Sequence, residues 1–431
     1  MKRNITKQLE DWKNWKKRKP LLLFGARQVG KTYLLREFGR SNFENVAYFD
    51  LEKQADARAV FEGNISPAEI LKKLGQVQGK KIEASSTLII IDEIQASNRA
   101  LASLKYFCEE MPKAYVVAAG SLLGVAVNRQ DYSAPVGKVE TLHLHPFTFD
   151  EFLTANGNEQ LIDAIRCSFE TNEAYFLHEK AIELFWIYVL VGGMPEVVRT
   201  FVDTSDFSEV SKVQNEIIDL YVADMAKYAT PFETARIHAT WQSMPSQLLK
   251  ENRKFQYRLI RSGARASQFE TALSWLETAG LINKCTNISS PQLPLALHEN
   301  NSAFKMYVAD TGLLCAMLGA RPSNILNIEN RRTFDAGPIV ENCVAQSLVS
   351  NSLKLAYWTS QGKAEIDFVA DFGESVGIPI EVKSSENVRS RSLNVFREKY
   401  KPPYSIRLSP KNFGFENGIK SVPLYATFCL K

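Results

Sequence analysis

The chain has 431 residues, 45% of them apolar and 23% charged, and a formal net charge of +4. This length exceeds what one hydrophobic core supports, so two or three domains are expected, and the composition is ordinary for a folded protein. The six cysteines are scattered without a C-x-x-C pair. That spacing excludes a disulfide framework or a zinc site and predicts buried thiols in a reducing compartment.

Neither a signal peptide nor a membrane span is expected. The first twenty residues are charged throughout and lack an apolar core, and the longest apolar stretch, Leu184 to Met194, is too short to cross a bilayer. We therefore expect a cytoplasmic protein with no membrane association.

The positive charge is concentrated near the end of the chain. Residues 331–431 contain 14 Lys and Arg against 10 Asp and Glu, a surplus of four that equals the net charge. Within this segment, Lys383 to Lys401 carries six basic and two acidic side chains. So local a surplus permits nucleic-acid binding without proving it.

The first elements in chain order surround a glycine-rich loop. Residues 1–18 predict an amphipathic helix, and the apolar run Leu21 to Phe24 predicts a buried strand. Residues 25–32, GARQVGKT, satisfy G-x-x-x-x-G-K-[ST] in full, and a helical pattern follows at once. This order of strand, loop and helix is typical of a nucleoside triphosphate site.

Each part of the loop has a physical role in holding phosphates. Gly25 and Gly30 let the backbone curl so that successive N–H groups point inward, and the following helix directs its positive end to the same place. Lys31 would reach the β- and γ-phosphates and take part in catalysis, while the Thr32 hydroxyl would bind Mg²⁺. The predicted ATP-binding residues are Gly25, Ala26, Arg27, Gln28, Val29, Gly30, Lys31, Thr32 and Tyr33.

An acidic pair supplies the second half of the predicted site. Four apolar residues after Thr87 lead into Asp92 and Glu93, as in a central parallel strand that is covered on both faces. Asp92 would hold Mg²⁺ opposite Thr32, and Glu93 would polarise the attacking water. ATP and Mg²⁺ are therefore the predicted cofactors.

Further strands are predicted at Val46–Asp50, Ala114–Ala119 and Val139–Leu144, with helices between them. Strands that alternate with helices predict an α/β domain, a parallel sheet with helices on both faces. Ser121 follows the strand that ends at Ala119, where it would either sense the γ-phosphate as a catalytic residue or cap the next helix. Both roles stay open.

Beyond residue 145 the pattern becomes helical, over 149–153, 174–202 and 208–228, with a break at Val191–Pro195 that indicates a cap, a hinge or a tight turn. Residues 245–318 then predict a winged helix. We expect short helices at Ser246–Lys250 and Gln256–Ser262, a third at Ala266–Ala279, and strands at Leu281–Thr286 and Phe304–Val308. The third helix exposes two glutamates, which favours protein contact over DNA reading, although Arg258, Arg261 and Arg265 leave DNA reading open.

A second constellation spans residues 337–383. Tyr357–Trp358 and Glu365–Val369 predict a hairpin around Gln361 and Gly362, and Ile378–Lys383 predicts another strand. Asp367, 14 residues before Glu381, and the sequence E-x-K at 381–383 match the metal site of restriction-endonuclease-like nucleases. Asp367, Glu381 and a helical Glu341 would converge on a second Mg²⁺ or Mn²⁺, and Lys383 would orient water.

These motifs together resemble a known family. GARQVGKT, IIIDEIQ, AAGSLL, HPFTFDEFL, GGMPEVV, FKMYVADTGLL, GPIVEN and IEVKSS look like the prokaryotic AAA-type ATPases that pair a P-loop domain with a C-terminal domain of unknown function. The resemblance implies an ATPase domain at 1–150, a helical region at 151–240, a winged-helix domain at 241–325 and a restriction-endonuclease-like domain at 326–431. Many members have Arg at the position of Lys138, so the arginine-finger role stays open among Arg99, Arg129 and Lys138.

The sequence therefore predicts an ATPase that couples ATP binding and hydrolysis to a nuclease-like domain in contact with DNA or RNA. Two alternatives stay open, namely a non-hydrolysing nucleotide switch that scaffolds a protein complex, and an ATP-regulated nuclease, for example in defence. A nucleotide is the expected ligand, and a protein partner or a homo-oligomer fits each of these readings.

Overall fold

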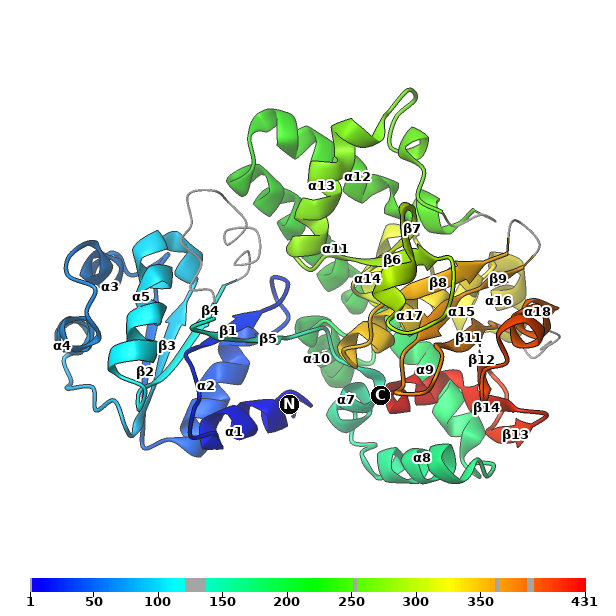
Figure 1. Ribbon diagram of the computed structural model, residues 1–431, viewed down its shortest axis with the longest axis horizontal. Helices are drawn as coiled ribbons and strands as arrows, with labels where there is room; N and C mark the ends of the chain where they lie inside the picture. Colours follow the sequence, from blue (N-terminus) through cyan, green and yellow to red (C-terminus); the bar gives the residue numbers. More distant parts are fainter. Residues whose placement is uncertain (1, 121–136, 251–253, 361–363, 386–390) are drawn as a thin grey trace. The chain divides into compact units, whose positions relative to one another are not determined.

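The computed structural model describes residues 2–120, 137–250, 254–360, 364–385 and 391–431 (Figure 1). Contacts divide these residues into two units. The N-terminal unit consists of Lys2–His145 with Thr278–Gly280, and the C-terminal unit consists of Pro146–Glu277 with Leu281–Lys431. Within the described ranges, no helix is long and apolar enough to cross a membrane.

A five-stranded parallel sheet forms the centre of the N-terminal unit, in the order β2-β3-β4-β1-β5. The strands are β1 (Leu21–Phe24), β2 (Asn45–Asp50), β3 (Thr87–Asp92), β4 (Tyr115–Ala119) and β5 (Glu140–His143). Every residue of β3 is buried, because a central strand of such a sheet is covered on both faces. The predicted α/β sheet is confirmed.

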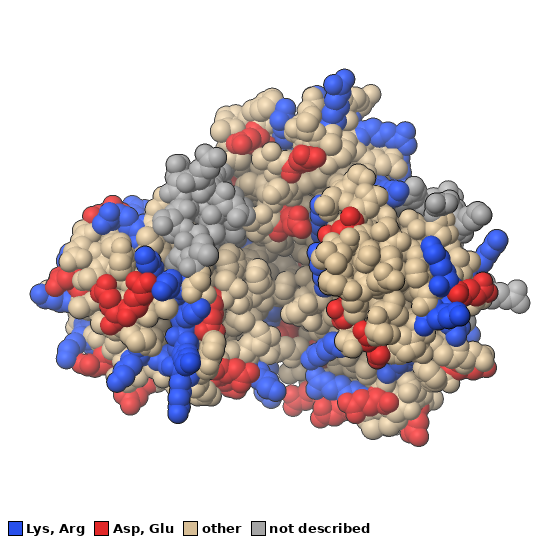
Figure 2. Space-filling model, in the orientation of Figure 1, with Lys and Arg blue, Asp and Glu red and all other residues tan. Residues whose placement is uncertain are grey.

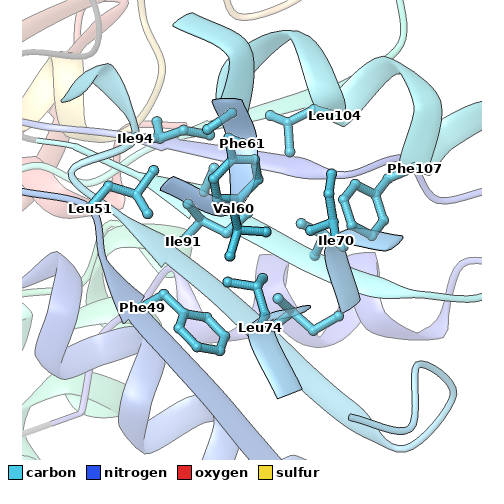
Figure 3. Packing of buried hydrophobic residues seen from close by; sticks show 14 of the residues in the cluster. Phe49, Leu51, Val60, Phe61, Ile70, Leu74, Ile91, Ile94, Leu104 and Phe107 are labelled. Carbon is cyan, nitrogen blue, oxygen red and sulfur yellow. The ribbon is translucent and has the colours of Figure 1, made fainter. Parts of the chain in front are cut away.

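Helices cover both faces of this sheet. They are α1 (Thr6–Asn14), α2 (Lys31–Asn42), α3 (Ala55–Ala59), η1 (Val60–Glu62), α4 (Pro67–Gln78), η2 (Ile94–Ala96) and α5 (Asn98–Glu110). Side chains of α4, η1 and α5 pack with Phe49 and Ile91 of the sheet in one apolar cluster (Figure 3). On the other face, Gly39 of α2 lets the helix backbone approach Val46 and Leu88 closely.

The C-terminal unit begins with a helical region that follows the predicted pattern. Its helices are α7 (Phe149–Ala155), α8 (Gln160–Thr171), α9 (His178–Val191), α10 (Pro195–Thr204), α11 (Phe207–Tyr228) and α12 (Pro231–Leu248). Thr148 and Glu151 form a capping box at the start of α7, and Pro195 opens α10, where the missing N–H costs nothing.

The break between α9 and α10 is a crossing of backbone segments. Gly193 accepts a hydrogen bond from Phe147 N at 2.6 Å and donates one to the Asp310 carboxylate at 2.6 Å. A Cβ on Gly193 would lie 2.2 Å from the Phe147 oxygen, and a Cβ on Gly312 would lie 2.3 Å from the Val191 oxygen. Only glycine fits at this crossing, so the break has a packing cause.

The region predicted as a winged helix differs in its helices. The predicted helix Ser246–Lys250 is wrong, because Ser246 to Leu248 form the end of the long α12. The predicted helix Gln256–Ser262 is reduced to the 3₁₀ turn η3 (Tyr257–Leu259). α13 (Ala266–Thr278) then leads into an antiparallel pair, β6 (Ile282–Ile288) and β7 (Glu299–Val308).

Two sheets organise the remainder of the C-terminal unit. One has the order β7-β6-β8-β9 and the other the order β10-β11-β12-β14-β13. Their other strands are β8 (Ala356–Thr359), β9 (Glu365–Ile366), β10 (Phe368–Ala370), β11 (Ile378–Val382), β12 (Ser405–Ser409), β13 (Gly414–Glu416) and β14 (Ile419–Pro423). The helices are η4 (Leu295–His298), α14 (Thr311–Met317), α15 (Pro322–Ile325), α16 (Ile328–Phe334), α17 (Gly337–Ser350), α18 (Arg391–Tyr400) and η5 (Leu424–Cys429).

One strand pair spans the predicted domain boundary at residues 325 and 326. β6 pairs in parallel with β8, so the four-stranded sheet contains residues from both predicted domains. Residues from all three ranges predicted after residue 150 lie in the C-terminal unit. The four-part division stays a prediction.

The strand predicted at Glu365–Val369 is interrupted at Asp367. β9 pairs with β8 in the four-stranded sheet, whereas β10 pairs with β11 in the five-stranded sheet. The chain therefore passes from one sheet to the other at Asp367, whose carboxylate accepts a hydrogen bond from Val382 N at 2.8 Å.

The cysteines differ from the prediction in part. All six are free, as expected, and Cys285, Cys315 and Cys343 are buried. Cys167 is exposed because it lies on the outer side of the amphipathic α8, whose buried residues are Leu161, Ile162 and Ile165.

Candidate functional site

The loop after β1 adopts a conformation that its glycines make possible. Gly25 has φ of +151°, and a Cβ there would lie 2.5 Å from the Leu144 oxygen at the end of β5. Gly30 has φ of +91° and occupies the N-cap position of α2, where it has no side chain to occupy the first free N–H groups of the helix. The loop therefore ends at an open, positively polarised helix end.

The N-terminal segment supports the back of the loop. Arg3 donates one hydrogen bond to the Val29 oxygen at 3.0 Å and another to the His145 oxygen at 2.5 Å. Val29 and Ala26 are buried, whereas Tyr33 is 58% exposed. The loop is thus anchored through its backbone and its apolar side chains.

Lys31 is the first residue of α2, and its ammonium folds back over the loop. It donates hydrogen bonds to the oxygens of Gly25 and Ala26, both at 2.8 Å. Burial lowers the pKa of Lys31 to about 8, although Glu93 and Asp92 oppose that shift. The amine is held at the loop but carries a proton only below a mildly alkaline pH.

Asp92 joins the loop to the end of β3. Its Oδ2 accepts hydrogen bonds from the Thr32 hydroxyl at 2.6 Å and from the Tyr48 hydroxyl at 3.0 Å. Burial and the neighbouring Asp92 raise the pKa of Tyr48, so this hydroxyl keeps its proton and donates. Arg36 of α2 lies 3.8 Å from the centre of the Tyr48 ring.

Glu93, the residue after β3, has an unusual backbone conformation. Its φ of +49° is left-handed, a conformation that costs a non-glycine residue about 1–3 kcal/mol. Its carboxylate accepts a hydrogen bond from Gln95 Nε2 at 2.5 Å. The carboxylates of Asp92 and Glu93 thus have different hydrogen-bond partners within the chain.

Sequence reasoning missed Tyr48 and Arg3. β2 pairs with β3 so that Asp50 is opposite Asp92, which brings Tyr48 to the same edge of the sheet. A phenol two residues from the end of an otherwise apolar strand was the available signal. No sequence pattern indicated the role of Arg3, because its partners are backbone oxygens that lie 26 and 142 residues away along the chain.

The predicted phosphate sensor and finger candidates have different outcomes. Ser121 and Arg129 lie outside the described residues. Arg99 donates to the oxygens of Phe61 and Gly63 at 2.7 and 2.6 Å. Lys138 forms an ion pair with Glu109 at 2.9 Å, which raises the pKa of Lys138. The arginine-finger role stays a prediction.

The three acidic residues of the predicted second metal site, Glu341, Asp367 and Glu381, each accept a hydrogen bond or form an ion pair within the chain. Glu381 of β11 forms an ion pair at 2.8 Å with Lys383, the residue after the strand, and burial raises the pKa of Glu381. Glu341, on α17, accepts instead from Lys305 at 3.1 Å and from the Tyr307 hydroxyl at 2.5 Å. Among the residues described, no group of three or more His, Cys, Asp and Glu side chains is arranged to hold a metal ion.

Comparison with known families places an AAA domain over the N-terminal unit. Residues 17–153 match a family model described as an AAA domain, residues 182–324 a domain of unknown function (DUF8612), and residues 336–427 a domain of unknown function (DUF4143). The search of curated proteins found no match. Together with the parallel sheet and the glycine-rich loop at its edge, the first match supports an AAA-type P-loop domain in the N-terminal unit.

Distant similarity to solved structures was found in several organisms. The Walker-type ATPase PABY2304 of Pyrococcus abyssi is 18% identical, with 73% of this chain and 94% of that chain covered and a TM-score of 0.43. The Thermotoga maritima RuvB Holliday junction branch migration motor is 16% identical, with coverages of 65% and 88% and a TM-score of 0.31. The ADP form of the Aeropyrum pernix ORC2 protein is 12% identical, with coverages of 65% and 85% and a TM-score of 0.32. Similarity this low contributes nothing to the functional proposal.

The lowered pKa of Lys31 predicts that ATP affinity depends on pH. A bound triphosphate favours the charged amine and raises its pKa above 8, so binding takes up a proton at alkaline pH. The dissociation constant for ATP should therefore rise about tenfold per pH unit above pH 8. In Lys31→Arg, whose side chain stays charged, the dissociation constant should not change with pH. Calorimetry measures this constant across the pH range. The same pH dependence in the wild type and in Lys31→Arg would contradict the role of the Lys31 charge in ATP binding.

Tyr48→Phe should raise the Mg²⁺ concentration needed for binding of the Mg²⁺–nucleotide complex. Nucleotide binding without Mg²⁺ should stay unchanged. The change removes one donor from Asp92, and a hydrogen bond of this kind contributes about 1 kcal/mol, or roughly fivefold in the Mg²⁺ concentration needed for half-maximal binding of the Mg²⁺–nucleotide complex. The measurement is a Mg²⁺ titration of fluorescent ADP. Tyr115→Phe, at the opposite edge of the same sheet, is the control, and an identical titration for both variants would refute the effect.

Proposed function

We propose that this protein is a Mg²⁺-dependent ATPase. The observation that carries the proposal is the hydrogen bond between Thr32 and Asp92, which joins the glycine-rich loop to the acidic end of β3. Two oxygen groups at the open end of α2 suit a small divalent cation, which prefers oxygen ligands. The proposed ATP-binding residues are 25–33, with Thr32 and Asp92 as the residues that hold Mg²⁺.

The remaining residues of the site have distinct proposed roles. The Lys31 ammonium would exchange the oxygens of Gly25 and Ala26 for those of the β- and γ-phosphates. Mg²⁺, when bound, neutralises charge on the transferred phosphoryl group. Glu93 would accept a proton from the attacking water, and Gln95 would hold the Glu93 carboxylate in place. Ser121 remains the proposed sensor of the γ-phosphate.

We further propose that ATP hydrolysis acts on a C-terminal unit that contacts DNA. The order of α17, the antiparallel pairs β8–β9 and β10–β11, α18 and the parallel strand β12 supports a restriction-endonuclease-like arrangement. α13 and the β6–β7 pair support a winged helix, whose exposed Glu270 disfavours contact with phosphates. The DNA contact is therefore assigned to α18, where Arg391 and Lys399 are exposed.

The charge distribution supports a local contact only. Acidic and basic side chains are interspersed over the face of the molecule in Figure 2. A nucleotide switch that scaffolds a protein complex is the alternative if no polyanion binds.

Glu93→Gln should retain ATP and lose hydrolysis, whereas Lys31→Ala should lose ATP binding. The amide cannot accept the proton of water, and general-base catalysis of this kind contributes about 10²–10⁴-fold in rate. Turnover and ATP binding are measured on the same preparations. Glu110→Gln, at the exposed end of α5, is the matched control, and turnover of Glu93→Gln equal to that of the wild type rejects this base.

DNA binding should weaken in Arg391→Ala/Lys399→Ala and decrease steeply with salt. Each lost phosphate contact should also reduce the salt dependence by about one unit of slope. Fluorescence anisotropy with a short labelled duplex measures both effects. Arg258→Ala/Arg261→Ala is the control, because weakening in that variant alone would move the contact to the winged-helix region, and no binding at low salt would favour the scaffold.

A further inference from the structure

Lys305 is a buried cation among acidic side chains. It lies on β7, its side chain is 0% exposed, and its ammonium is 3.1 Å from Glu341 and 2.7 Å from Glu365. An ammonium without partners at this depth would be strongly destabilising, so the two carboxylates are a condition for its burial. The Tyr357 ring lies 5.0 Å from the same ammonium and closes the site on another side.

Strand geometry makes this arrangement part of the fold. Lys305 and Tyr307 lie two residues apart on β7 and so project from the same face, and both donate to Glu341 Oε1. Glu365 reaches the ammonium from β9, in the same four-stranded sheet. The ammonium of Lys305 is therefore held in position by side chains of α17 and β9, which are far from β7 in the sequence.

The carboxylate of Asp367 is a further acidic group in this part of the unit. Asp367 is two residues from Glu365, at the passage between the sheets, and it accepts from Val382 N. Burial raises the pKa of the Cys285 thiol, and the charges that act on that thiol are those of Lys305, Glu365 and Asp367. The ammonium and the two carboxylates therefore all lie near one buried thiol.

A divalent ion fits poorly beside Lys305. Such an ion would have to share the carboxylates of Glu341 and Glu365 with an ammonium about 3 Å away, where like charges repel strongly in a low-dielectric interior. The Glu381 carboxylate is engaged in the same way by Lys383. Each carboxylate of the predicted second metal site thus has a donor within the chain.

We propose that Lys305 is the permanent cation of this acidic site and takes the place of a metal ion. The C-terminal unit then folds and binds DNA without a divalent metal, and it does not cleave phosphodiesters. This inference uses the proposed restriction-endonuclease-like arrangement but is independent of ATP hydrolysis in the N-terminal unit.

Metal dependence of Lys305→Met tests the proposal. The full chain is used without nucleotide and in an Asp92→Ala background, so that the nucleotide site loses its metal-binding carboxylate. The melting temperature is measured against Mn²⁺ concentration, and bound Mn²⁺ is counted by electron paramagnetic resonance. We expect no Mn²⁺ effect with Lys305 present, and in Lys305→Met a lower melting temperature that Mn²⁺ partly restores with one ion bound per chain.

Several outcomes would overturn the proposal. The first is stabilisation by Mn²⁺ of the protein that retains Lys305, if Asp367→Ala removes this stabilisation. The second is metal-dependent cutting of DNA or RNA. The third is a Lys305→Met protein that is as stable as its parent and whose melting temperature does not depend on Mn²⁺. Lys305→Arg, which keeps the charge, should fold and stay indifferent to Mn²⁺. If Lys305→Met does not fold, the Mn²⁺ titration of the parent and of Lys305→Arg decides the question. Failure of ATP hydrolysis in the wild type would leave this result unchanged.

Discussion

The hydrogen bond from Thr32 to Asp92 unites the parts of the nucleotide site. It requires that β1 and β3 end at the same edge of the sheet, and the parallel order β2-β3-β4-β1-β5 satisfies that requirement with β4 between them. It also requires the loop to turn sharply into α2, which Gly25 and Gly30 allow. The hydrogen bond thus depends on the sheet order, the loop conformation and the position of the carboxylate together. A change in any of these would separate the phosphate-binding residues from the residues that hold Mg²⁺.

The C-terminal unit is organised around buried polar contacts instead. Asp310 accepts N–H groups at the glycine crossing, and burial raises its pKa to about 6. Asn342 pairs with both backbone groups of Val308, and Lys305 is enclosed by Glu341 and Glu365. Because a buried polar group is costly without its partner, these contacts specify one arrangement of α17 against β7.

Local patterns in the sequence were sufficient for the N-terminal sheet and for the conformation of the loop. The run Leu21 to Phe24 and the strand that ends at Asp92 have the lengths and apolar character that the structure gives them. Pairing between distant segments was not predictable. The interruption at Asp367 depends on which sheet each half of the predicted strand joins. The role of Lys305 was missed because its strand was predicted from the apolar residues alone. The roles of the site residues stay predictions, since position alone does not establish chemistry.

The most direct test of the central claim is a crystal structure of the full chain with ADP and Mg²⁺. The account predicts the β-phosphate against the backbone N–H groups of residues 28–32 and Mg²⁺ beside Thr32 and Asp92. It also predicts that in this complex the Lys31 ammonium contacts the phosphates in place of the oxygens of Gly25 and Ala26, to which it donates at 2.8 Å in the present structure. Nucleotide bound elsewhere, or a Lys31 that still contacts those oxygens with the phosphates in place, would contradict it.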